Sequence, residues 1–112
     1  MLTDTLAADF SSANRVHVAY CSGDTYQGKQ TKADASTWGL WFTGKTNLEA
    51  IVADLKDRHG MDRATQVLLT GESAGAVACY QNADSLAEWM GPDVAVSAAP
   101  VSGWFFPVSF RP

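Results

Sequence analysis

Only two cysteines occur among the 112 residues, Cys21 and Cys79, which are too few for a disulfide framework and have no partners at metal-ligand spacing. No apolar run approaches the roughly 18 residues of a membrane-spanning helix. The first nine residues also lack the basic start and apolar middle of a secretory signal. Eight Lys and Arg stand against twelve Asp and Glu, with no positive cluster. We therefore expect neither a transmembrane segment nor a nucleic-acid partner.

The composition is that of an ordinary folded protein. Hydrophobic residues make up 46% of the chain and charged residues 18%, and the length allows one domain. Three segments have strand patterns: the alternating run Arg15 to Cys21, the apolar run Val67 to Thr70, and Val94 to Ala98. The unbroken apolar run at Val67 predicts a strand that is covered on both faces.

The clearest helix signal lies between the first two of these strands. Thr46 and Glu49 form a capping-box pattern, and apolar residues then recur at helical spacing. Gly60 offers a left-handed stop after basic residues that suit the end of a helix. These signals predict a helix from about Thr46 to His59.

Two further helices are expected between the second and third strands. One should start after Ser73 and run to about Gln81, and a short one should cover Leu86 to Met90 behind a cap at Asp84 or Ser85. Strands that alternate with helices over such short connections predict an α/β fold, a parallel sheet with flanking helices in a three-layer sandwich. The long polar connection from Gly23 to Trp38 is of the kind that is functional or inserted.

The segment Gly71-Glu72-Ser73-Ala74-Gly75 matches the Gly-x-Ser-x-Gly nucleophile elbow. In that motif a strand turns directly into a helix around a strained serine, and side chains at the two glycines would find no room. The pattern arises by chance in roughly one chain of this length in twenty, but here it lies between an apolar strand and a helix of small residues. Two other interpretations are a plain N-cap at Ser73 and a phosphate-binding turn, which the charge of Glu72 opposes.

With its flanks, the elbow resembles the pectin acetylesterase and Notum family of serine carboxylesterases. The resemblance covers most of residues 14 to 106, and the spacing between its blocks fits the family. The chain departs from the family pattern at Glu72, where plant members usually have Cys, at Ala76, where a third glycine is common, and at Thr43, where Phe-Arg-Gly is frequent. The blocks that carry the resemblance are Asn14-Arg15-Val16-His17-Val18-Ala19-Tyr20-Cys21 with Asp24 and Gly28, Gly60-Met61 through Ala64 to Gly75, Asn82-Ala83-Asp84, and Ser102-Gly103-Trp104-Phe105.

The resemblance implies a secreted esterase of α/β-hydrolase type that hydrolyses an O-acyl ester, such as an acetyl ester of a carbohydrate, through an acyl-enzyme. Ser73 would be the nucleophile, and the backbone N–H of Ala74 would donate in the oxyanion hole. In such enzymes the triad follows the order Ser, Asp or Glu, His, but no histidine follows Ser73 in this sequence, and His17 and His59 are interpreted as structural. We therefore expect residues 1–112 to be a single partial domain, the central piece of a longer enzyme, with neither cofactor nor metal.

The aromatic segment after the third strand is the candidate substrate wall. The carboxyl ends of neighbouring parallel strands carry the ligand sites of open α/β sheets, so Trp104 and Phe105 are expected beside Ser73, with Phe106 a weaker candidate. The competing interpretation is that these aromatic side chains belong to the hydrophobic core. At the level of function, the alternative to an esterase is a non-catalytic binding module. Such a module would keep the two elbow glycines because the fold needs them, and it would have lost the catalytic base.

Overall fold

The structure, a computed structural model that describes residues 8–105, contains a parallel strand–helix–strand unit with a second helix beside it. Strands β1 (Gln66–Glu72) and β2 (Ala95–Val101) pair in parallel, with Gln66 opposite Ala95 and Glu72 opposite Val101. This arrangement confirms the predicted α/β class with a parallel sheet and flanking helices, in an incomplete form. The helices are α1 (Gly44–His59) and α2 (Ala74–Met90), and the short 3-10 helices are η1 (Ala8–Phe10), η2 (Ala35–Thr37) and η3 (Met61–Arg63).

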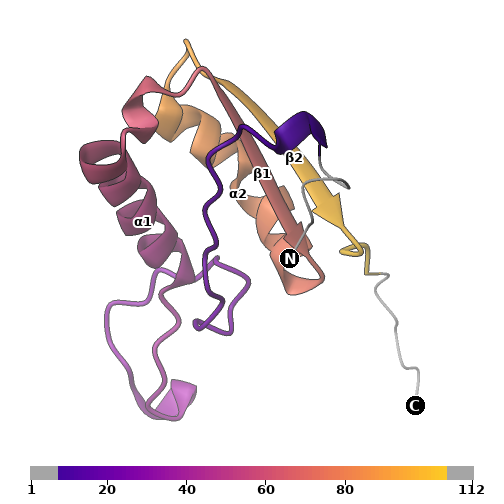
Figure 1. Cartoon of the computed structure of the whole chain (residues 1–112). Coiled ribbons are helices and arrows are strands. Elements are labelled where there is room, and N and C mark those ends of the chain that lie inside the picture. The colour runs from indigo at the N-terminus through magenta and orange to yellow at the C-terminus, as the bar shows by residue number, and fades with distance from the viewer. Residues whose placement is uncertain (1–7, 106–112) are drawn as a thin grey trace.

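The core lies between the helices and one face of the sheet. Figure 1 shows α2 along one face of the two strands, with α1 beside it. Val52 of α1 packs with Leu86 and Met90 of α2, and strand residues such as Leu69 close the cluster from the sheet side. On the other face, Leu68 is 45% exposed. The prediction that this strand is covered on both faces is therefore wrong for the part of the chain that the structure describes.

The segment Arg15 to Cys21 was expected to be a strand and is not one. It has no regular secondary structure and pairs with neither β1 nor β2. A period of two in the sequence creates the side-chain pattern of a strand, but the strand itself requires a neighbour that accepts and donates the ladder hydrogen bonds. Within residues 8–105 this segment has no such neighbour.

Helix α1 begins two residues earlier than the capping pattern predicted. Thr43 is the N-cap residue, its side chain makes no capping hydrogen bond, and Thr46 lies inside the first turn. The loop that precedes the helix supplies the missing acceptors: the N–H of Gly44 donates to Asp24 at 2.8 Å, and the N–H of Lys45 donates to the Gly28 carbonyl at 2.9 Å. The predicted end at Gly60 is confirmed, with φ at 76°.

Helix α2 is continuous where two helices were expected. No glycine or proline interrupts residues 76–90, so the polar pair Asp84 and Ser85 lies within the helix instead of capping a new one. Ser85 accepts a hydrogen bond from Lys45 at 2.5 Å, which gives its hydroxyl a tertiary partner. None of the helices among residues 8–105 has the length and apolar character needed to cross a membrane.

Candidate active site

Ser73 forms the turn between β1 and α2 in a strained backbone conformation. Its φ of 55° and ψ of −115° fall outside the regions that a residue with a Cβ adopts readily. The residue occupies the N-cap position of α2, but its side chain makes no capping hydrogen bond, and it is exposed. A serine kept at a helix start for capping would accept a hydrogen bond from a backbone N–H of the first turn, and Ser73 accepts none.

Close backbone contacts hold this turn in place. A Cβ at Gly71 would lie 2.5 Å from the carbonyl oxygen and 2.6 Å from the carbonyl carbon of Gly75, so only glycine fits at position 71. The N–H of Ser73 donates to the carbonyl of Val101 at 3.0 Å and ties the turn to the end of β2. Gly75 differs from the sequence-based expectation, because a Cβ at that position would meet no atom within 4 Å.

The backbone N–H of Ala74 is available at the first turn of α2. The carbonyl of Ser73 accepts from Ala76 at 3.0 Å and from Val77 at 3.1 Å, which starts the helix. The N–H of Ala74 precedes those bonds and donates to no acceptor among the described residues, as expected for the first orphan donors of a helix. The positive end of the helix dipole lies at the same place. This turn can therefore stabilise a negative oxygen next to the Ser73 hydroxyl.

The aromatic segment follows β2 and lies against the start of α2. Ser102 has a φ of 55°, and Gly103 is buried so closely on α2 that a Cβ would lie 2.2 Å from the Cβ of Ala76. After this turn, Trp104 is 73% exposed and Phe105 is 62% exposed. Neither side chain belongs to the core of the described part, and their role as a wall stays a prediction. Phe106 lies outside the described residues.

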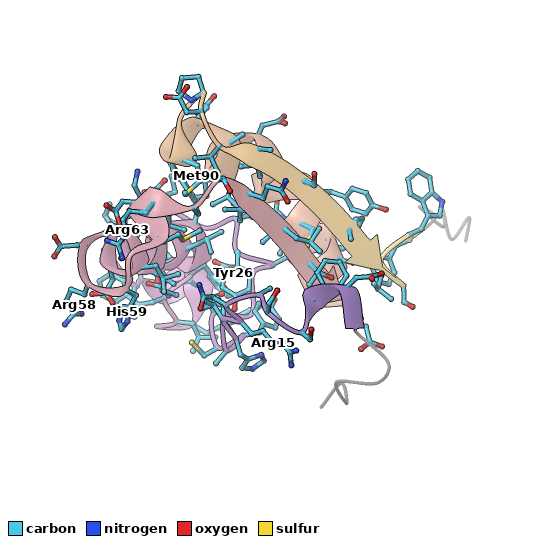
Figure 2. All side chains as sticks on the ribbon, turned by 45° about the horizontal axis from the view of Figure 1, so that its top comes forward. Arg15, Tyr26, Arg58, His59, Arg63 and Met90 are labelled. Atoms are coloured by element: carbon cyan, nitrogen blue, oxygen red, sulfur yellow. The ribbon has the colours of Figure 1, made fainter. Side chains whose placement is uncertain are left out.

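Neither histidine contacts Ser73. His59 ends α1, where it lies 3.6 Å from Asp54. Figure 2 shows it beside Arg58, on the side of the molecule opposite the arrowheads of the strands. His17 is exposed on the unpaired segment. The Ser73 hydroxyl makes no hydrogen bond to any described residue, and the later carboxylates Asp84 and Glu88 are on the exposed side of α2. Residues 8–105 therefore present a candidate nucleophile without a base in contact.

Asp24 organises the long connection that precedes α1. Its carboxylate accepts from the Ser22 hydroxyl at 2.6 Å and from the N–H groups of Tyr26, Gly28 and Gly44 at 3.0, 3.1 and 2.8 Å. Burial raises the pKa of this carboxyl, but these four hydrogen bonds outweigh that effect and bring the pKa below its ordinary value. Reasoning from sequence assigned no role to this residue, although an Asp among glycines in a long polar loop is a signal for such a turn.

A second polar cluster joins this loop to α2. Asn82 is only 1% exposed, and its amide nitrogen donates to the carbonyls of Ala78 at 2.9 Å and Tyr26 at 3.3 Å. Its amide oxygen accepts from Lys45 at 2.8 Å, and the Lys45 ammonium lies 4.7 Å from the centre of the Trp89 ring. Burial, assisted by the nearby charge of Lys29, lowers the pKa of Lys45. The cluster fixes α1 against α2 and thereby supports the helix that starts at Ser73.

Neither cysteine forms a disulfide in the structure. Cys79 is buried in α2, where burial raises the pKa of its thiol, and Cys21 is exposed.

The site defines the class of protein as an α/β protein whose sheet leads into a strained serine turn. The model of the family described as pectinacetylesterase matches residues 3–110. The chain belongs to that family.

The chain is similar to several curated esterases. It is 34% identical over 98 residues to palmitoleoyl-protein carboxylesterase notum1a of Danio rerio, covering 84% of this chain and 19% of that protein. Human palmitoleoyl-protein carboxylesterase NOTUM is 33% identical with the same coverage. Pectin acetylesterase 5 of Arabidopsis thaliana is 32% identical over 100 residues, which are 89% of this chain and 23% of that protein. The chain thus spans about a fifth of the length of these relatives, and no solved structure gives a significant match.

Proposed function

We propose that the protein is a serine carboxylesterase that hydrolyses an O-acyl ester, such as an acetyl ester of a carbohydrate, with Ser73 as the nucleophile. The observation that carries the proposal is the backbone of Ser73, at φ 55° and ψ −115°, on a turn where the side chain is exposed and caps nothing. Strain of this kind persists where function requires it. The family and its named esterases support the same chemistry.

The proposed reaction has two steps. The Ser73 oxygen attacks the carbonyl carbon, and the negative oxygen that forms is stabilised by the Ala74 N–H and by the start of α2. The bond to the alcohol then breaks, and the proton of the Ser73 hydroxyl is passed by a base to the leaving alcohol. Water releases the acid from the acyl-enzyme by the same route in reverse. The base and its carboxylate partner are expected outside this chain, which would then be a single partial α/β-hydrolase-like domain over 1–112.

A serine-directed fluorophosphonate tests the proposal on the protein that contains this chain. We expect the label on Ser73, located by mass spectrometry of the digested protein, and we expect Ser73→Ala to remove it. Ser102→Ala is the matched control, because Ser102 is also exposed and also has a positive φ of 55°, and it should leave labelling intact. Label on Ser102, or labelling that survives Ser73→Ala, would contradict the assignment.

An unreactive Ser73 would instead favour the alternative, a non-catalytic binding module that keeps the elbow glycines for folding alone. In that case Gly71 would still be required for stability, whereas Ser73→Ala would change neither the fold nor any bound ligand. We extend the esterase proposal to an extracellular location, which is the expectation from the family resemblance. Fractionation of the producing cells would check that expectation.

A further inference from the structure

Glu72 places a negative charge directly beside Ser73. It is the last residue of β1 and lies opposite Val101, whose carbonyl accepts from the N–H of Ser73 at 3.0 Å. Its side chain is exposed and makes neither an ion pair nor a hydrogen bond with any residue among 8–105. The alternation along β1 directs Glu72 to the same face as Leu68, away from α2.

Several basic side chains of the described part are engaged away from Glu72. Lys29 pairs with Glu49 at 3.1 Å, and Lys45 is held by Asn82 at 2.8 Å. Arg58 and Arg63 belong to the far end of α1 and the adjoining η3, at the amino ends of the strands, as Figure 2 shows. The chain as a whole carries a formal charge of −4. A substrate that approaches the carboxyl ends of β1 and β2 therefore meets the negative charge of Glu72, which no ion pair among residues 8–105 neutralises.

The other exposed side chains at this end of the sheet have the chemistry that complements such a field. Trp104 and Phe105 follow β2, on a turn that Gly103 presses against Ala76 at the start of α2. Aromatic faces attract cations and offer an anion no hydrogen bond comparable to that of a basic side chain. A carboxylate with neighbouring aromatic surfaces thus suits a cationic or an uncharged group and opposes an anionic one.

We propose that Glu72 is a specificity-determining residue that makes the ester site prefer substrates with a cationic or uncharged group near the scissile bond over substrates with an anionic group there. The proposal rests on the proposed esterase function. If the substrate is an acylated carbohydrate, the role of Glu72 limits it to one in which the sugar unit that bears the ester carries no acidic group. Through-space attraction of this kind acts on kcat/KM and weakens as salt screens the charge.

Three acetyl esters of the same phenol framework test the proposal in the full protein that contains this chain. One carries no charge, one a para-trimethylammonium group and one a para-sulfonate group. After each kcat/KM is divided by that ester's rate constant for hydrolysis by hydroxide, which removes the difference between the leaving groups, we expect the wild-type values to fall in the order cationic, neutral, anionic, with about a five-fold difference per step, which corresponds to about 1 kcal/mol. In Glu72→Gln the cationic-to-anionic ratio should fall towards 1. Glu88→Gln removes a carboxylate about 22 Å further along α2 at 1.5 Å per residue, and it should keep the wild-type ratio.

The outcomes separate the two proposals. If the wild-type protein hydrolyses none of the three esters, both the esterase function and this inference fail. If it hydrolyses them and Glu72→Gln keeps the wild-type ratio, the esterase function stands and the inference is overturned. Should Glu72→Gln not fold, the salt dependence of the wild-type protein decides. The cationic-to-anionic ratio must shrink between low and high ionic strength, and a ratio that salt leaves unchanged overturns the role of charge.

Discussion

The two glycines of the elbow should respond very differently to the same substitution. A Cβ at Gly71 would lie 2.5 and 2.6 Å from the carbonyl oxygen and carbon of Gly75. The obstructing atoms are backbone, so no rotamer change relieves the overlap, and the start of α2 must move by about 1 Å to reach ordinary contact distances. Overpacking costs about 1–3 kcal/mol where side chains can adjust, and we expect Gly71→Ala to cost about 3 kcal/mol.

Gly75→Ala is the matched control because it adds the same methyl group four residues later. Nothing lies within 4 Å of its new Cβ, and alanine favours a helix over glycine by roughly 1 kcal/mol. Urea unfolding of the full protein should therefore show a large loss of stability for Gly71→Ala, and no loss or a small gain for Gly75→Ala. Fluorophosphonate labelling of Ser73 should likewise be lost in Gly71→Ala and kept in Gly75→Ala. Equal destabilisation by the two variants would refute the close approach of β1 to α2 as the reason for glycine at position 71.

Three further outcomes are expected. Asp24→Asn should lower the free energy of unfolding by about 2–4 kcal/mol at neutral pH, since it loses charge-assisted hydrogen bonds. The folded pKa of Asp24 lies below the ordinary 3.8, so its stabilisation is present above that pH and disappears as the pH falls through the folded pKa; urea unfolding at several pH values should show the two proteins converge in acid. Phe105→Ala in the full protein should change the preferred acyl length with little change in melting temperature, whereas a core residue would cost ~3–5 kcal/mol and leave that preference unchanged. Residues 1–112 alone should give negligible turnover of an aryl acetate. Turnover of about 1 per second that is lost in Ser73→Ala would instead show that the chain supplies its own base.

Sequence patterns predicted those ends of helices and strands that are determined by residues close by in the sequence. The ends of α1 at Gly60 and of β1 at the elbow follow from a left-handed glycine and from the change from apolar strand to small helical residues. The Thr46 capping box failed because Asp24 and the Gly28 carbonyl, which are about twenty residues away in the chain, satisfy the first donors of the helix. A capping motif describes an isolated helix, and a tertiary partner can replace it.

Non-local partners also explain the remaining differences. The alternation in Arg15 to Cys21 is a pattern of side chains, and it becomes a strand only when another strand lies beside it. Lys45 and Asn82 are separated by 37 positions, and no local rule connects a lysine in the first turn of one helix to an amide in the middle of the next. The one available signal was that a polar residue, Asn82, stands among the buried positions of α2.

The turn between strand and helix at Ser73 could be predicted because its geometry is produced within one strand–helix–strand unit. Three close contacts fix it: Gly71 against the backbone of Gly75, Gly103 against Ala76, and the hydrogen bond from the Ser73 N–H to the Val101 carbonyl. All of them join β1, α2 and β2, which follow one another in the sequence, so the residues that form the turn are specified by a short stretch of chain. A catalytic base has no such constraint, because it must reach Ser73 from another element. The strained serine is thus a property of this unit by itself, whereas its reactivity depends on what lies beside the carboxyl ends of the two strands.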